Sequence, residues 1–184
     1  MGAIDLIKAD KFRYVGKDRS FLHTYLRYEG FRFSVWLRIC HSLNRNKLTK
    51  YTMLMAARLV YKHYKYKYGY DIPYQSEIGP GLCIYHFGGV VFSAKSAGKN
   101  LTISQNTTVG MRIYDGEKKY PVIGDNLYLA PGAAIVGNVV VGNNVAIGTN
   151  AVLLENACDK SVYIGIPGKK VSLNGSLQYI SNPV

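Results

Sequence analysis

The chain has 184 residues, of which 48% are hydrophobic and 18% charged, and this composition excludes a disordered chain. Its length suits one compact domain with a small additional segment. Cys40, Cys83 and Cys158 are too few and too widely spaced for a disulfide scaffold or a CxxC zinc site, so they favour a reducing compartment.

Positive charge is concentrated in residues 1–70, which hold 15 Lys and Arg against 4 Asp and Glu, a net charge of +11. Residues 71–184 hold 8 against 7 and are nearly neutral. This asymmetry indicates an anionic partner for the first segment, either nucleic acid or a membrane surface. The first residues, Met1–Leu6, carry neither an apolar export signal nor a myristoylation signal, so we expect a cytoplasmic protein.

The first 70 residues predict helices. Phe33, Trp36, Leu37 and Cys40 recur at helical spacing, with Arg32, Arg38 and Arg45 expected on the polar side. Residues 49–63 are typical of a second helix, and Gly69 is expected to end the helical segment. The Tyr- and Lys-rich stretch 61–68 fits either a helix face or a strand.

Beyond residue 70 an aliphatic or small residue recurs about every six positions. These thirteen positions are Ile72, Ile78, Ile84, Val90, Ala97, Ile103, Val109, Ile123, Leu129, Ile135, Val141, Ile147 and Leu153, with a one-residue shift at Ala97. A six-residue repeat is the signature of a parallel β-helix, in which each hexapeptide forms one side and three sides make a coil. The aliphatic residues would then point inward and stack on one another, about 4.8 Å apart.

The repeat is interrupted at residues 113–122, which we expect to form a loop extruded from the prism. Residues 126–154 are uncharged over 29 positions, but five asparagines and Pro131 argue against a transmembrane helix there. We therefore expect three parts: a basic α-helical segment at 1–70, a β-helix at 71–171 and a C-terminal tail at 172–184.

Several motifs resemble the serine acetyltransferases of the hexapeptide-repeat acyltransferase superfamily. They are, in chain order, Gly69–Pro73, Ile78–Leu82, Tyr85–Gly89, Ile103–Gly110, Pro121–Asp125 and Gly165–Lys169, and together they cover residues 69–171. The resemblance implies a mainly β fold, a left-handed parallel β-helix preceded by a small α-helical segment. It also implies homotrimers with active sites between subunits and acetyl-CoA as co-substrate. Gly30–Phe33 and Leu37–His41 are closer to a branch found with bacterial capsule and glycan genes.

The resemblance places the catalytic base at His86, which precedes a Gly-Gly pair. A hydroxyl that attacks a thioester must lose its proton, and an imidazole is suited to accept it near neutral pH. Asp71 matches the family position that pairs with this histidine, and a carboxylate there would fix the imidazole tautomer. His23, His41 and His63 are expected to be structural. Four scattered histidines form no metal cluster, so we predict no metal.

The same resemblance implies a set of residues for acetyl-CoA. Backbone N–H groups near Gly110 and Met111 would bind the thioester oxygen. Ala130, Pro131, Gly148 and Thr149 would line the pantetheine, while Lys169 or Lys170 would meet the nucleotide phosphates. Turn geometry explains the glycines as well, and adjacent lysines are often merely solvated.

Departures from the serine enzymes suggest a different acceptor. Tyr85 replaces an acid beside the histidine, Lys119-Tyr120 replaces Arg-His, and Ala94 stands where an acid is common. Tyrosines offer a ring face and a hydroxyl to a sugar, so Tyr85, Tyr114, Lys119 and Tyr120 are the candidate acceptor contacts.

The function expected from the sequence is therefore an O-acetyltransferase that modifies a sugar hydroxyl of a capsule or other surface polysaccharide precursor by direct acetyl transfer. Serine O-acetyltransferase of cysteine biosynthesis is the alternative, and a non-catalytic β-helix scaffold is a third hypothesis. The basic segment would hold the enzyme at the anionic inner face of the membrane rather than at nucleic acid, unless its charges are simply solvated.

Overall fold

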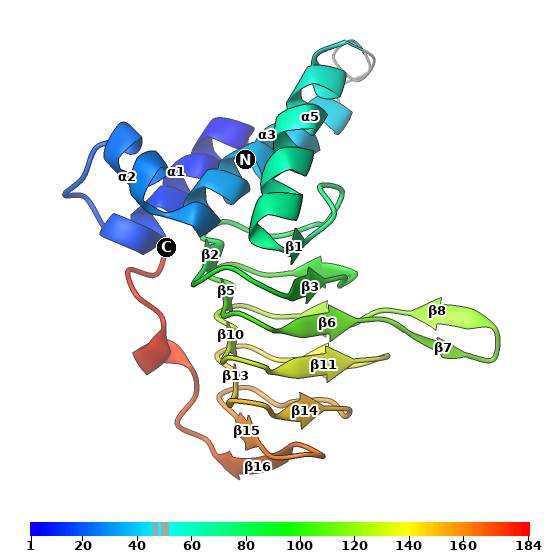
Figure 1. The fold of residues 1–184 in the computed structure, drawn as a ribbon. Coiled ribbons are helices and arrows are strands. Elements are labelled where there is room, and N and C mark those ends of the chain that lie inside the picture. Colours follow the sequence, from blue (N-terminus) through cyan, green and yellow to red (C-terminus); the bar gives the residue numbers. More distant parts are fainter. Residues whose placement is uncertain (46–47, 49–51) are drawn as a thin grey trace.

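The computed structural model describes residues 1–45, 48 and 52–184. Among these residues, four helices form a cap at one end, and a three-sided prism of short strands, parallel except for the last one, extends away from it (Figure 1). The helices are α1 (Ala3–Val15), α2 (Phe21–Arg27), α3 (Glu29–Arg45) and α5 (Met53–Tyr68).

Each side of the prism is one sheet. The first contains, in spatial order, β1 (Tyr70–Asp71), β3 (Val90–Phe92), β6 (Thr108–Gly110), β11 (Ala134–Val136) and β14 (Val152–Leu153). The second contains β2 (Cys83–Ile84), β5 (Thr102–Ile103), β10 (Tyr128–Leu129), β13 (Ala146–Ile147), β15 (Val162–Ile164) and β16 (Lys169–Ser172). The third contains β4 (Ser96–Ala97), β9 (Val122–Ile123) and β12 (Val140–Val141).

The hexapeptide positions form the core as predicted. All thirteen of them, from Ile72 to Leu153, are buried, and the columns stack in register, as in Ile84, Ile103 and Leu129. At one corner, Asn100, Asn126 and Asn144 each adopt a positive φ of 58°, which asparagine tolerates better than most residues. Their side-chain amides bond to one another from coil to coil at 2.8 Å. Asn126 and Asn144 of the uncharged stretch therefore build corners. No helix among the described residues is long and apolar enough to cross a membrane.

The phase shift that the sequence shows at Ala97 has a structural cause at the preceding corner. Val90 is buried, but Phe92 is the residue that pairs with Val109, so the column position predicted for Val90 belongs to Phe92. The corner between β2 and β3 is consequently longer than the others, and it contains His86.

Two antiparallel strands, β7 (Arg112–Tyr114) and β8 (Glu117–Lys119), form a hairpin that projects from the prism where the repeat is interrupted (Figure 1). After β16 the chain turns back along the prism through a short 3₁₀ helix, Leu177–Tyr179, and ends beside the helical cap.

The helical predictions hold with one correction. Phe33, Leu37 and Cys40 are buried on α3, the stretch 61–68 is helical, and Gly69 ends α5 in the left-handed conformation. The helix predicted over 49–63 begins at Met53, and residues 49–51 lie outside the described residues. The prediction that Arg38 lies on the polar, exposed side of the helix is wrong. Arg38 is 3% exposed because it forms an ion pair with a buried carboxylate.

That carboxylate belongs to Asp10, and the pair fastens the cap to the prism. Arg38 donates to both Asp10 oxygens at 2.9 and 3.0 Å and to the carbonyl of Gly79 at 2.7 Å. Asp10 Oδ1 also accepts from the backbone N–H groups of Gly81 and Leu82 at 3.0 and 2.8 Å. One ionic cluster thus joins α1, α3 and the first coil.

Arg13 makes a second connection and is fully buried. Its guanidinium donates to the carbonyls of Gly81 (2.6 Å) and Ser181 (2.7 Å) and to Thr102 Oγ1 (2.7 Å). The tail is therefore held against α1 and the first coils.

We expect Arg38→Ala to lower the free energy of unfolding by about 3–5 kcal/mol, because it leaves the Asp10 carboxylate buried without its counter-charge. Denaturant titration at fixed protein concentration measures this loss. Lys95→Ala, at an exposed position on the prism, is the control and should change stability by less than about 0.5 kcal/mol. An Arg38→Ala protein as stable as the control would contradict the role of the pair.

Candidate active site

His86 lies on the enlarged corner that follows β2. Its side chain is exposed, and its φ of +60° is unusual for a residue other than glycine. Tyr70 Oη donates to the His86 carbonyl at 2.9 Å, and burial raises the pKa of that phenol, so it stays protonated. A strained backbone that the surroundings hold in place is frequent at functional sites.

A cavity of about 310 Å³ opens beside His86 and is shared between the prism and the cap. Tyr85, His86 and Phe87 line it from the prism, and Tyr14, Arg27, Tyr28 and Glu29 line it from the helices. Tyr14 Oη accepts from the N–H of Ile84 at 2.8 Å and donates to its carbonyl at 3.2 Å, so α1 braces the strand that leads to His86. Sequence reasoning missed Arg27 and Glu29, because only the fold brings the α2–α3 junction to this corner.

Asp71, the expected partner of His86, lies on β1 and is exposed. Its carboxylate accepts from Lys65 Nζ at 2.6 Å, and it lines a different cavity from His86. Within the described ranges, no ion pair joins Asp71 to His86 in this chain. Their pairing stays a prediction.

Four of the expected acetyl-CoA positions share one edge of the prism with His86. Ala130 and Pro131 follow β10, and Gly148 and Thr149 follow β13, at the same turn between the second and first sheets. Three strand spacings separate the His86 level from the Gly148 level, or about 14 Å. This edge is therefore a column of small residues running down from His86.

A cavity of about 220 Å³ lies along this column and is lined by Ala130, Gly148 and Thr149 together with apolar side chains. One wall is Tyr179 from the C-terminal tail, whose ring stacks on Tyr128 at 4.8 Å between centroids. The tail also approaches the first corner, where Tyr85 Oη donates to Ser181 Oγ at 3.3 Å. Tyr179 lies outside the hexapeptide repeat, so the repeat pattern could not predict its position beside this column.

The other predicted residues lie elsewhere on the chain. Gly110 ends β6 and Met111 follows it, at the next edge, between the first and third sheets. Tyr114, Lys119 and Tyr120 belong to the adjoining hairpin or follow it, so a single chain does not bring these residues to His86. Lys169 and Lys170 are exposed on β16, at the end of the prism away from the cap.

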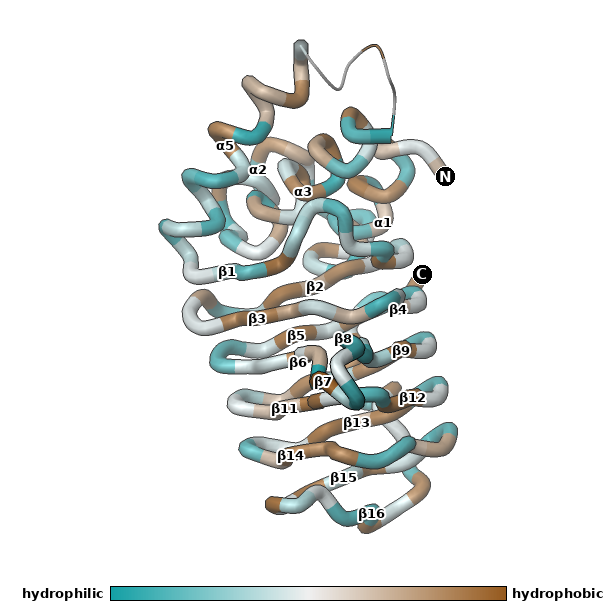
Figure 2. Tube along the Cα trace, turned by 90° about the vertical axis from the view of Figure 1, so that its right-hand side faces the viewer, coloured by the Kyte–Doolittle hydropathy of each residue, from teal (hydrophilic) through white to brown (hydrophobic). Residues whose placement is uncertain are grey.

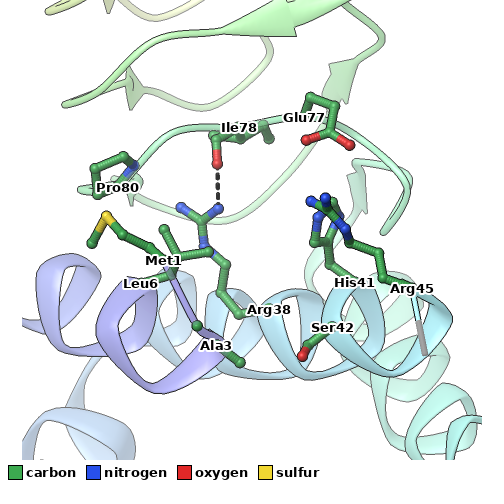
Figure 3. A pocket seen from close by; sticks show the side chains of 11 residues that line it. Met1, Ala3, Leu6, Arg38, His41, Ser42, Arg45, Glu77, Ile78 and Pro80 are labelled. Carbon is green, nitrogen blue, oxygen red and sulfur yellow. Dashed lines mark hydrogen bonds between the residues drawn. The ribbon is translucent and has the colours of Figure 1, made fainter. Parts of the chain in front are cut away.

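A further cavity, of about 440 Å³, is separate from all of these residues. It lies between α1, α3 and the first coil, and Arg38, His41, Arg45 and Glu77 are among its lining residues (Figure 3). His41 is partly buried and its Nδ1 lies 3.0 Å from the carbonyl of Tyr74, in agreement with a structural role. In the part of the chain that the structure describes, no three His, Cys, Asp or Glu side chains are grouped to hold a metal ion.

The comparisons with known proteins agree on one class. Residues 120–155 match the family described as bacterial transferase hexapeptide (six repeats). The Staphylococcus aureus serine acetyltransferase is 36% identical over 159 residues, covering 85% of this chain and 72% of the relative. The chain is thus a hexapeptide-repeat transferase.

Solved structures extend the likeness to the fold. Neisseria gonorrhoeae serine acetyltransferase superposes with a TM-score of 0.77 at 24% identity, covering 95% of this chain and 66% of that one. The soybean enzyme complexed with serine gives a TM-score of 0.76 at 26% identity, covering 92% of this chain and 70% of that one. The chain belongs to the serine acetyltransferase family. The predicted left-handed β-helix with its helical segment is confirmed, and so is the predicted class of O-acetyltransferase using acetyl-CoA.

The expected glycan acceptor, and with it the assignment to capsule or polysaccharide synthesis, is wrong. The curated relatives and the solved neighbours are serine acetyltransferases. The substitutions at Tyr85, Ala94 and Lys119-Tyr120 were therefore misleading about the acceptor.

The cysteines offer no nucleophile among these residues. Burial raises the pKa of Cys40 and of Cys83 to about 11, so both remain thiols near neutral pH, whereas Cys158 is exposed and far along the prism. Since the thiolate is the reactive form, a covalent acetyl-cysteine has no support here.

We expect one thiol of the native protein to react rapidly with a disulfide reagent at pH 8. Cys158→Ser should remove the rapid phase, because protonation and burial protect Cys40 and Cys83. Absorbance of the released chromophore counts the thiols, and addition of denaturant should expose all three. A rapid phase that persists in Cys158→Ser would show that Cys83 or Cys40 is reactive.

Proposed function

We propose that this chain is a serine O-acetyltransferase, which transfers the acetyl group of acetyl-CoA to the hydroxyl of L-serine. The observation that carries the proposal is the presence of two opposite charges, Arg27 and Glu29, among the residues that line the cavity beside His86. No described residue forms an ion pair with either of them. A free amino acid presents a carboxylate and an ammonium group a short distance apart, so it complements this cavity, whereas a neutral sugar would leave both charges unpaired.

His86 is the proposed general base. Its imidazole accepts the proton of the seryl hydroxyl as the oxygen attacks the thioester carbonyl, and it returns that proton to the departing sulfur. The acetyl C–S bond breaks as the C–O bond forms, so transfer is direct. In the assembled enzyme, Asp71 would release Lys65 and accept a hydrogen bond from His86, and this would orient the imidazole.

The residues along the prism edge fit acetyl-CoA, which supplies an activated acetyl thioester when bound. Ala130, Pro131, Gly148 and Thr149 leave room for an extended arm, and the apolar cavity at their level suits its hydrocarbon portion. Lys169 and Lys170 lie further from the cap, where they would meet the nucleotide phosphates.

The proposed enzyme is a homotrimer. Gly110, Met111 and the hairpin residues Tyr114, Lys119 and Tyr120 lie at a different edge from His86. In a threefold assembly, this edge of one copy lies against the His86 edge of the next, and N–H groups near Gly110 could stabilise the developing oxyanion.

Each part of the chain then has a task in the cytoplasm, where acetyl-CoA is made. Residues 1–70 close the serine cavity, residues 71–171 carry the transfer site, and the tail at 172–184 walls the acetyl-CoA column.

We expect His86→Ala to lower kcat for serine acetylation by about 10²–10⁴-fold, which is the usual contribution of a general base. Release of CoA from acetyl-CoA with L-serine, followed with a thiol reagent, measures the rate. His63→Ala, on the exposed face of α5, should retain full activity. The absence of saturable turnover with serine in the unmodified protein would refute the proposed function, and His86→Ala activity within tenfold would refute the role of His86.

Glu29→Gln and Arg27→Ala should each raise KM for serine by about 10- to 100-fold, since a hydrogen bond to a charged group contributes about 1.5–3 kcal/mol. KM for acetyl-CoA should stay the same, because neither residue lines the acetyl-CoA column. Glu77→Gln, which removes a carboxylate from the separate cavity of Figure 3, is the matched control. An equal rise in both KM values, or none in either, would show that Arg27 and Glu29 do not recognise the amino acid.

A further inference from the structure

The helical cap presents a helix end far from the prism. α3 and α5 run side by side in opposite directions, so that α3 ends and α5 begins at the end of the molecule away from β1 (Figure 1). The last residue of α5, Tyr68, adjoins β1, whereas Met53 is at the outer end. Copies that assemble side by side about an axis along the prism would all present this outer end in the same direction.

The outer face of α5 is unusually apolar. Leu54, Ala57 and Tyr61 are buried against the core, as an amphipathic helix requires. On the opposite face Met55 and Leu59 are 59% and 72% exposed, and Met53 at the end of the helix is 60% exposed. Brown and teal segments alternate along α5 in Figure 2. Single exposed apolar side chains are ordinary, but a group along one helix face marks an interaction surface.

The positive charge of the same helix indicates which kind of partner would bind this face. α5 contains Arg58, Lys62, Lys65 and Lys67 and no acidic residue. Lys65 forms an ion pair with Asp71. Lys62 is exposed, and it lies between the exposed side chains of Leu59 and Tyr66. A second copy of this face would bring like charges together, whereas an anionic surface complements both the helix and the net charge of +11 over residues 1–70.

We infer that the outer end of α5 docks on an anionic lipid bilayer. Met53, Met55 and Leu59 enter the boundary between headgroups and acyl chains, and the exposed Lys62 extends to the lipid phosphates. A nucleic acid would contact the basic side chains but leave the three apolar side chains exposed. An uncharged apolar partner would cover the apolar side chains but leave the basic ones without a counter-charge. Docking at this helix would determine where the enzyme resides and does not depend on which acceptor it acetylates.

Vesicle co-sedimentation of the full chain tests the inference. One set of vesicles contains phosphatidylglycerol and phosphatidylcholine, and the other contains phosphatidylcholine alone, each at low and high salt. We expect binding to the anionic vesicles at low salt and a loss of at least about tenfold in the partition coefficient at high salt or without phosphatidylglycerol.

Matched variants separate the charged from the apolar contribution. Lys62→Glu should lower the partition coefficient by at least about fivefold, the effect of roughly 1 kcal/mol for each basic residue at the surface. The double variant Met55→Ser with Leu59→Ser should lower it similarly at unchanged charge. Lys95→Glu, on the prism, makes the same change in net charge and should have little effect. Circular dichroism checks that the variants retain their helices.

The inference would be overturned if the protein did not bind vesicles, or if it bound both vesicle types equally. It would also be overturned if Lys95→Glu lowered the partition coefficient as much as Lys62→Glu. Sedimentation velocity adds one further outcome. A concentration-dependent association that the Met55→Ser, Leu59→Ser variant abolishes would assign the face to a second copy of the chain instead.

Discussion

The stacking of one aliphatic side chain upon another, coil after coil, is the constraint on which the rest of this structure depends. Columns such as Ile84, Ile103 and Leu129 are buried completely or nearly so, and each inward side chain contributes roughly 1.5–3 kcal/mol. Because the columns fix the register, every corner of the prism recurs at the same edge. The small residues after β10 and β13 therefore lie in line below His86.

The site is formed where this regularity is broken. The corner after β2 is enlarged, Phe92 takes the column position expected for Val90, and His86 adopts a positive φ. The second interruption, between β6 and β9, releases the β7–β8 hairpin at another edge. A scaffold that repeats so regularly can hold such departures in fixed positions, which is what a transfer between two bound substrates requires.

The helical cap is joined to the prism by ionic contacts rather than by the repeat. Asp10, Arg38 and Arg13 are buried between α1, α3 and the first coils, and Arg13 also binds the returning tail. These contacts position Arg27 and Glu29 beside His86. In the proposed function the acceptor is recognised by a part of the chain that carries no hexapeptide signal, and substitutions within the prism alone were misleading about it.

The sequence by itself determined the β-helix, the thirteen core positions, the helices at 33–40 and up to Gly69, and the family, because six-residue and helical periodicities are local properties. The tertiary structure alone decided that Arg38 is buried, that Phe92 replaces Val90 in its column, and that Asp71 pairs with Lys65 within one chain. It also decided which helical charges reach His86 and that Tyr179 stacks on Tyr128. Apart from the Lys65–Asp71 pair, these contacts join residues distant along the chain, and no local pattern records which distant side chain will arrive.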